Sequence, residues 1–180
     1  MSNITIGISD LNVARPPDIL VTYALGSCVG ICLYDANAKV AGMSHILLPS
    51  SAQMPGNKTP MKFADTAIPM LMVKMQAMGA RPTSLQAKIA GGAQMFAAMS
   101  NASIANIGAR NVAAVKETLA RLRIPIIVED TGSNYGRTLL FNAHVDVVPP
   151  SEGMDDAFEG REENGILYGR GACDNKGSIA

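Results

Sequence analysis

Aromatic residues, cysteines and histidines are scarce in this sequence, and each scarcity limits what the protein can be. Tryptophan is absent and only 4% of the 180 residues are aromatic, so aliphatic side chains and eleven methionines must fill the interior. There are three cysteines, Cys28, Cys32 and Cys173, which form neither an even set nor a CxxC pair. This usage is typical of free thiols in a reducing compartment and argues against a disulfide framework.

Net charge and long apolar runs are also lacking. The formal net charge is zero, which argues against nucleic acid as the main partner. No apolar run approaches the ~18 to 20 residues needed to cross a bilayer, and the first ten residues lack the pattern of a secretory signal. We therefore expect a cytoplasmic protein that does not insert into a membrane.

The neutral total conceals two parts of opposite charge. Residues 1–142 carry twelve Lys and Arg against seven Asp and Glu, whereas residues 143–180 carry three against eight. The length of the chain suits either one domain with a hydrophobic core or one domain followed by a tail. We expect a folded domain over residues 1–142, followed by an acidic tail over residues 143–180 that is not an independent domain.

The segment from residue 22 to residue 45 contains the candidate catalytic pair. Two β-forming runs, VGICLYD and KVAGMSHILL, are joined by the short segment ANA and predict a hairpin that brings Cys28 opposite His45. An imidazole within hydrogen-bond reach favours the thiolate of a cysteine and can return the proton to a leaving amine. Cys28 is therefore the candidate nucleophile and His45 the candidate base.

Three neighbours of this pair are candidates for supporting roles. The hydroxyl of Thr22 can orient the imidazole, Gly26 allows a substrate to approach the backbone, and the amides around Ser27 and Cys28 can face an oxyanion. Ordinary structural explanations stay open for these positions: a buried small cysteine, a strand threonine and a turn glycine. Cys32, which alternates with Gly30 and Tyr34 within the strand, is interpreted as a core residue.

The remaining pattern predicts an α/β fold, a layered sandwich of mixed or antiparallel strands with covering helices. Strands are expected at ITIGI, ILVTYAL, LQAKIAGGA and PIIVED and from Arg137 onward, and helices over residues 61–78 and 106–124. Pro69 predicts a kink in the first helix or a new helix start after Ala67. The methionine stripe of that helix is interpreted as core packing. The Gly pair after LQAKIA fits either an anion site or tight packing.

Several separate motifs carry a resemblance to a known family. ALGSCVGICLYD, GMSHILLP, AGGAQMF, IGARNVAAV and EDTGSNYGRT occur in this order between about residues 4 and 138. Together they resemble CheD, the chemoreceptor glutamine deamidases of bacterial and archaeal chemotaxis. The resemblance implies a cysteine deamidase fold, with Cys28 as nucleophile, His45 as base and Thr22 assisting. It also implies that residues 49–60 form a lip beside the active site.

The same resemblance implies a substrate and a partner. The substrates would be glutamines on the cytoplasmic helices of methyl-accepting chemotaxis receptors, and the partner a CheC-type phosphatase. No metal or organic cofactor is implied. An alternative that stays open is a non-catalytic binding module that engages the phosphatase or a receptor helix. Substitution of Cys28 by Ala separates the two hypotheses, because only the enzyme would lose its effect.

Residues 139–180 resemble a different family. They contain an HxD strand and a GRGxxDxKG loop, as in the metal-binding segment of zinc aminoacylase and dipeptidase-type metallopeptidases. That resemblance implies His144, Asp146 and Asp174 as metal ligands, with Cys173 nearby. A binuclear hydrolytic site needs further His and acidic ligands and a glutamate to activate water. We therefore expect at most a weak metal site in an inactive metallopeptidase fragment, or an extended run that completes a sheet edge.

Overall fold

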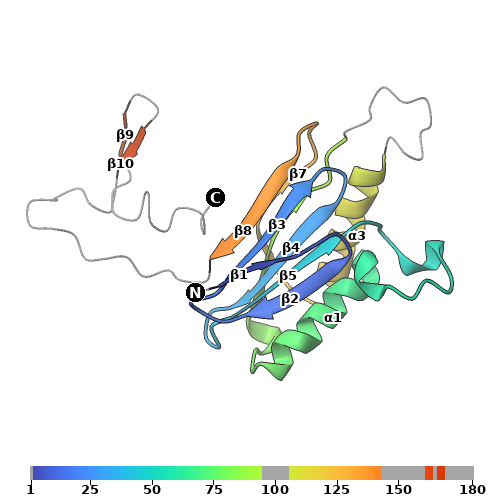
Figure 1. Ribbon diagram of the computed structural model, residues 1–180, viewed down its shortest axis with the longest axis horizontal. Coiled ribbons are helices and arrows are strands. Elements are labelled where there is room, and N and C mark those ends of the chain that lie inside the picture. Colours follow the sequence, from blue (N-terminus) through green and yellow to red (C-terminus); the bar gives the residue numbers. More distant parts are fainter. Residues whose placement is uncertain (1, 95–105, 143–160, 164–165, 169–180) are drawn as a thin grey trace, which may run out of the picture.

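The strands and helices bury their aliphatic faces against one another, and this packing produces three layers. The computed structural model describes residues 2–94, 106–142, 161–163 and 166–168 (Figure 1). A five-stranded sheet forms the middle layer, with two helices against one face and a three-stranded sheet against the other (Figure 1). The expected layered α/β sandwich of mixed strands with covering helices is confirmed.

The central sheet contains the predicted hairpin. Its order is β2 (Asp10–Ala14), β5 (Val40–Ile46), β4 (Val29–Asp35), β6 (Leu85–Gly91) and β7 (Ile126–Thr131). All neighbours are antiparallel except β6 and β7. β5 is buried along its whole length because both of its faces are covered. β2 was not expected from the sequence, since Asp10 and Asn12 are residue types that favour turns.

The second sheet pairs strands that lie far apart in the sequence. It consists of β1 (Asn3–Thr5), β3 (Ile19–Leu25) and β8 (Arg137–Asn142) in the order β1-β3-β8. Leu20 pairs with Phe141, and both pack against Met43 of the central sheet. The described residues also include a separate antiparallel pair, β9 (Arg161–Glu163) and β10 (Ile166–Tyr168).

Helix α1 (Ala64–Ala77) covers the other face of the central sheet. It begins later than expected, because Met61 lies in a preceding 3-10 turn (Pro60–Lys62). The expectation of a new helix start after Ala67 is wrong: α1 continues through Pro69. Proline near the beginning of a helix deprives only one carbonyl, that of Asp65, of its partner. Met75 is completely buried in the core, as the packing interpretation of the methionine stripe predicted.

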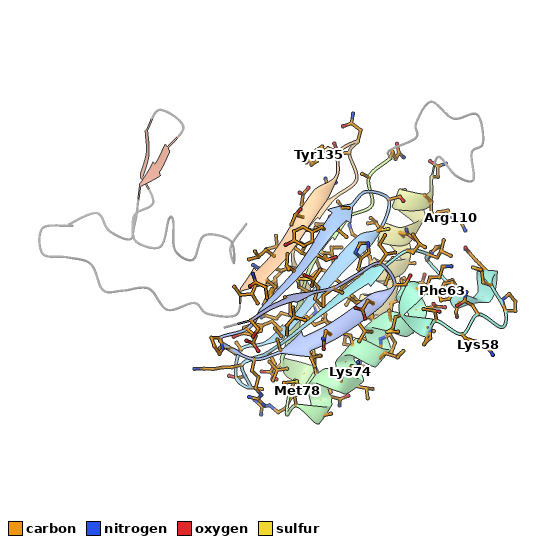
Figure 2. All side chains as sticks on the ribbon, viewed as in Figure 1. Lys58, Phe63, Lys74, Met78, Arg110 and Tyr135 are labelled. Atoms are coloured by element: carbon orange, nitrogen blue, oxygen red, sulfur yellow. The ribbon has the colours of Figure 1, made fainter. Side chains whose placement is uncertain are left out.

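Helix α3 (Ile107–Arg121) lies beside α1, and its buried side includes Val115 and Leu119 (Figure 1). Two other members of the predicted stripe, Val112 and Leu122, are partly buried. The basic residue Arg110, which Figure 2 labels on this helix, is exposed, in agreement with a solvated face. Side chains fill the spaces between the layers (Figure 2). None of the helices in the described part of the chain is long and apolar enough to span a membrane.

Candidate active site

The β4–β5 hairpin places Cys28 and His45 on the same face of the central sheet. His45 is directly opposite Gly30, and Cys28 lies two residues before that glycine. Because side chains two residues apart along a strand share a face, the thiol and the imidazole are diagonal neighbours across the hairpin. This face is turned toward the three-stranded sheet, where Cys28 packs against Leu25 and Leu139. The thiol lies at the entry of β4, as expected from the sequence, but the expectation that Cys28 stands directly opposite His45 is wrong, because the observed register places Gly30 there.

Thr22 fixes the protonation pattern of the imidazole. Its Oγ1 lies 2.8 Å from the carbonyl oxygen of Ile6 and 2.7 Å from Nδ1 of His45. A carbonyl can only accept, so the single hydroxyl proton is donated to Ile6. Nδ1 of His45 must then carry its own proton and donate it to Thr22. In the neutral ring, Nε2 is consequently left unprotonated and able to accept a proton.

Burial acts on both the imidazole and the thiol. His45 Nε2 is buried and has no hydrogen-bond partner among the described residues. Burial lowers the pKa of His45. Burial also raises the pKa of the Cys28 thiol, against the opposing effect of a hydrogen bond from its own backbone amide. The hydrogen bond from the thiol to the imidazole that we expected is therefore not formed among the described residues, and burial favours the uncharged form of each group.

The turn from Gly26 to Cys28 is held by its three carbonyl groups. The carbonyl of Gly26 accepts from the amide of Ala93 at 2.7 Å, and that of Cys28 accepts from the amide of Gly92 at 2.7 Å. The carbonyl of Ser27 accepts from the side-chain amide of Asn111 at 2.8 Å. By contrast, no other residue in the described ranges accepts a hydrogen bond from the amide of Ser27 or Cys28. Apart from the hydrogen bond of the Cys28 amide to its own sulfur, these two amides have no described acceptor and can face a developing negative charge.

Two glycines at the end of β6, Gly91 as its last residue and Gly92 directly after it, allow the chain to pack tightly behind this turn. A Cβ atom on Gly91 would lie 2.2 Å from the carbonyl oxygen of Cys28, and one on Gly92 would lie 2.2 Å from the side chain of Val112. Both glycines also have positive φ angles, +113° and +68°. Tight packing therefore accounts for this pair. The amide of Gly92 donates its hydrogen bond to the carbonyl of Cys28 and is therefore not available to bind an anion.

Sequence reasoning missed Asn111. This residue is completely buried on α3, and its Nδ2 atom also donates to the carbonyl of Leu47 at 3.0 Å. It therefore connects the turn from Gly26 to Cys28 to the segment that follows His45. One signal was available: Asn111 occupies the same helical stripe as Val115 and Leu119, where a polar side chain needs a partner.

Hydrogen bonds hold the segment after His45 in place. The amides of Leu47 and Leu48 donate to the carbonyl of Lys62, and the carboxylate of Asp65 accepts from the hydroxyls of Ser50 and Ser51. These contacts hold the ends of residues 49–60 close to the strand that carries His45. The role of this loop as a lip for a substrate stays a prediction.

No metal site is formed by the residues that the structure describes, since they contain no suitable group of three or more His, Cys, Asp or Glu side chains. The ligand candidates from the tail, His144, Asp146, Cys173 and Asp174, lie outside the described residues. A separate cavity of about 290 Å³ opens between β6, β7 and β8 and is lined by Cys32. Cys28 is not among its lining residues.

Comparison with known proteins decides the family. The model of the family described as CheD chemotactic sensory transduction matches residues 47–148. A curated relative from Lachnoclostridium phytofermentans is 54% identical over 139 residues, covering 77% of this chain and 86% of the relative. This chain belongs to the CheD family. A second CheD relative, from Clostridium novyi, is 55% identical over 139 residues with the same coverage.

The names of the CheD relatives state an activity for those proteins. Both of these relatives, and a third from Caldanaerobacter subterraneus that is 54% identical over 136 residues, are named probable chemoreceptor glutamine deamidase CheD. The third match covers 76% of this chain and 84% of the relative. Beyond the CheD region, residues 140–180 match the model of peptidase family M20/M25/M40. Both resemblances read from the sequence are thus supported by family models.

Solved structures show more distant similarity. A hypothetical protein from Bacillus licheniformis, YfiH, aligns with a TM-score of 0.44 and 16% identity, over 68% of this chain and 50% of that protein. A Neisseria meningitidis protein of family DUF152 has the same TM-score and 10% identity, over 69% of this chain and 54% of that protein.

Proposed function

We propose that this protein hydrolyses the side-chain amide of glutamines on chemotaxis receptors, with Cys28 as the nucleophile. The observation that carries the proposal is the buried Nε2 of His45, which has no described hydrogen-bond partner while Nδ1 is engaged by Thr22, on the hairpin that Cys28 begins. The activity named for CheD relatives that are 54–55% identical supports the choice of substrate. The amides of Ser27 and Cys28, which donate to no other described residue, support the choice of chemistry.

The first half-reaction forms a thioester. The sulfur of Cys28 bonds to the carboxamide carbon of the glutamine while its proton passes to Nε2 of His45. The carbonyl oxygen becomes an oxyanion, which the amides of Ser27 and Cys28 stabilise by hydrogen bonds. Imidazolium His45 then gives its proton to the amine as the carbon–nitrogen bond breaks, so that ammonia leaves. Thr22 keeps the ring in the required orientation throughout.

The second half-reaction releases glutamate and restores the enzyme. Nε2 of His45 accepts a proton from a water molecule, and the resulting hydroxide attacks the thioester carbon. The carbon–sulfur bond breaks, and the sulfur of Cys28 recovers the proton from His45. Each step uses the same base and the same amides, and no step requires a metal ion or an organic cofactor.

The proposal extends to where the protein acts and to its partners. We expect it to act on the cytoplasmic helices of methyl-accepting receptors and to engage a CheC-type phosphatase, both of which follow from the family resemblance. A domain over residues 1–142 and a tail over residues 143–180 stay predictions, as does the metal-binding role of the tail. A binding module that needs no thiol chemistry is the main rival.

Intact-mass analysis of a receptor cytoplasmic fragment tests the proposal. Conversion of each glutamine to glutamate adds about 1 Da, and we expect this gain with the unaltered protein but not with its Cys28→Ala variant. Cys32→Ala is the matched control, because it removes the neighbouring thiol of the same strand. No gain with the unaltered protein, or equal gain with Cys28→Ala, would contradict the enzymatic proposal and favour the binding module.

A further inference from the structure

Asn111 is oriented unambiguously by its two hydrogen bonds. Its side chain is completely buried, and both groups that it contacts, Ser27 and Leu47, present carbonyl oxygens. Carbonyls only accept, so the NH₂ end of the side chain must face them. The other end, Oδ1, is buried without a partner among the described residues. A buried polar atom without a partner is costly, which indicates that the two donated bonds determine the position of this residue.

The hydrogen bond from Asn111 to the carbonyl of Ser27 determines the direction of the amide of Cys28. In a planar trans peptide the carbonyl and the following N–H point in opposite directions. The carbonyl of Ser27 is held toward α3, so the amide of Cys28, which belongs to the same peptide, is turned away from α3. That amide makes no hydrogen bond to another described residue. A rotation of this peptide would break the bond to Asn111 and turn the amide of Cys28 inward.

We propose that Asn111 is a positioning residue that keeps the Ser27–Cys28 peptide oriented for oxyanion stabilisation and ties it to the segment after His45. This role rests on the proposed function, and it assigns to α3 a part in the chemistry. Asn111 does not touch the substrate. It acts through the amide of Cys28 and, by its bond to Leu47, limits the movement of the turn from Gly26 to Cys28 relative to β5.

Two reactions of the same thiol separate this role from a merely structural one. Alkylation by iodoacetamide forms a carbon–sulfur bond and releases iodide at a tetrahedral carbon, so no oxyanion develops. Acylation by p-nitrophenyl acetate forms a thioester and releases p-nitrophenolate through an oxyanion. Both need an accessible sulfur and a proton acceptor. Only acylation needs the amide of Cys28 in its present orientation.

The experiment compares both rates at Cys28 in the full-length protein and its Asn111→Ala variant. Peptide mass spectrometry assigns each product to Cys28, and Cys28→Ala gives the background. We expect acylation to slow by about 10²- to 10³-fold, the usual effect of losing one oxyanion donor, with alkylation changed less than about threefold. Thr118→Val, which alters another buried polar residue of α3, is the matched control and should leave both rates unchanged.

Further outcomes decide between the explanations. Equal slowing of acylation and alkylation, or no slowing of either, would overturn the positioning role. Asn111→Ser keeps one short donor and is measured alongside; if Asn111→Ala does not fold, the same split in Asn111→Ser supports the role and its absence overturns it. Failure of the unaltered protein to deamidate receptors, with the split still present, would count against the proposed substrate and not against Asn111.

Discussion

Cys28 and Cys32 lie four residues apart, the first just before β4 and the second inside it, and their surroundings differ. Cys32 is inside the sheet, paired with Met43 on one side and Lys88 on the other, and burial raises its pKa to about 12. Cys28 lies just before the strand, with a 7% exposed side chain and a backbone amide that no neighbouring strand uses. The comparison teaches that the end of a strand, where backbone groups become free, suits a nucleophile better than its middle.

Replacing His45, the proposed base beside Cys28, should lower kcat more than any substitution beside Cys32. Glutamine has a similar shape to histidine but cannot accept the proton of the thiol, so His45→Gln should lower kcat by about 10²- to 10⁴-fold. The measurement is the deamidation rate of the receptor fragment by mass. Met43→Leu, opposite Cys32, is the control and should change kcat less than about threefold. Comparable loss in both variants would mean that general packing, and not the base, limits the reaction.

Loss of the hydroxyl that orients the ring should have a smaller effect. Thr22→Val keeps the shape of the side chain but removes the acceptor for Nδ1–H, so the unprotonated Nε2 is no longer enforced. We expect kcat to fall by about 10- to 100-fold, as is usual for residues that orient a functional imidazole. Thr22→Ser restores the hydroxyl and should recover most of the activity. Equal activity of the Val and Ser variants would remove Thr22 from the mechanism.

The pH dependence of kcat/KM, which reports the pKa values of the free enzyme, follows from the burial of His45. Because burial lowers the pKa of His45, its neutral form persists below the ordinary value of 6.5. An unperturbed histidine would retain only about one tenth of its neutral form at pH 5.5, so we expect the enzyme to keep a larger share of its plateau rate there. A rate profile between pH 5 and pH 8 is the measurement. An acid limb at or above pH 6.5 would contradict the lowered pKa.

The free energy of unfolding should rise with pH over the same range, because of His45. The unfolded chain binds a proton at its ordinary histidine pKa, whereas the folded chain does so only at lower pH. The contribution of His45 to the free energy of unfolding is therefore fully present above about pH 6.5 and declines as the pH falls toward the folded pKa. Circular dichroism at each pH separates a loss of folded protein from a loss of the neutral base.

The smallest effect on catalysis is expected at Cys32. Cys32→Ser buries a hydroxyl in an apolar cluster, which should lower the free energy of unfolding by about 1–3 kcal/mol. The kcat value of the folded protein should change less than about twofold, because the pocket that Cys32 lines excludes Cys28. Urea unfolding and the mass assay test both statements. A large loss of kcat without a loss of stability would extend the active site to Cys32.

Local patterns were enough to predict the hairpin and the two residues that it brings together. VGICLYD and KVAGMSH are β-forming runs with a short connection, so the hairpin follows from local sequence, whereas its register differs by two residues from the expected one, with Gly30 and not Cys28 opposite His45. The contacts across layers could not be predicted in this way. The bond of Thr22 to Ile6 depends on the second sheet, and Asn111 lies far from Ser27 along the chain. Their partners are determined by tertiary packing, which local periodicity does not encode.

The pairing of Leu20 with Phe141 has a consequence for the order in which the molecule is made. During synthesis on the ribosome, the β4–β5 hairpin can form soon after its residues emerge, because its contacts are close together in the chain. The sheet that carries Thr22 gains its last strand only after Phe141 has been translated, and such distant contacts form slowly. The nascent chain would thus contain a paired thiol and imidazole well before the sandwich that orients them has closed.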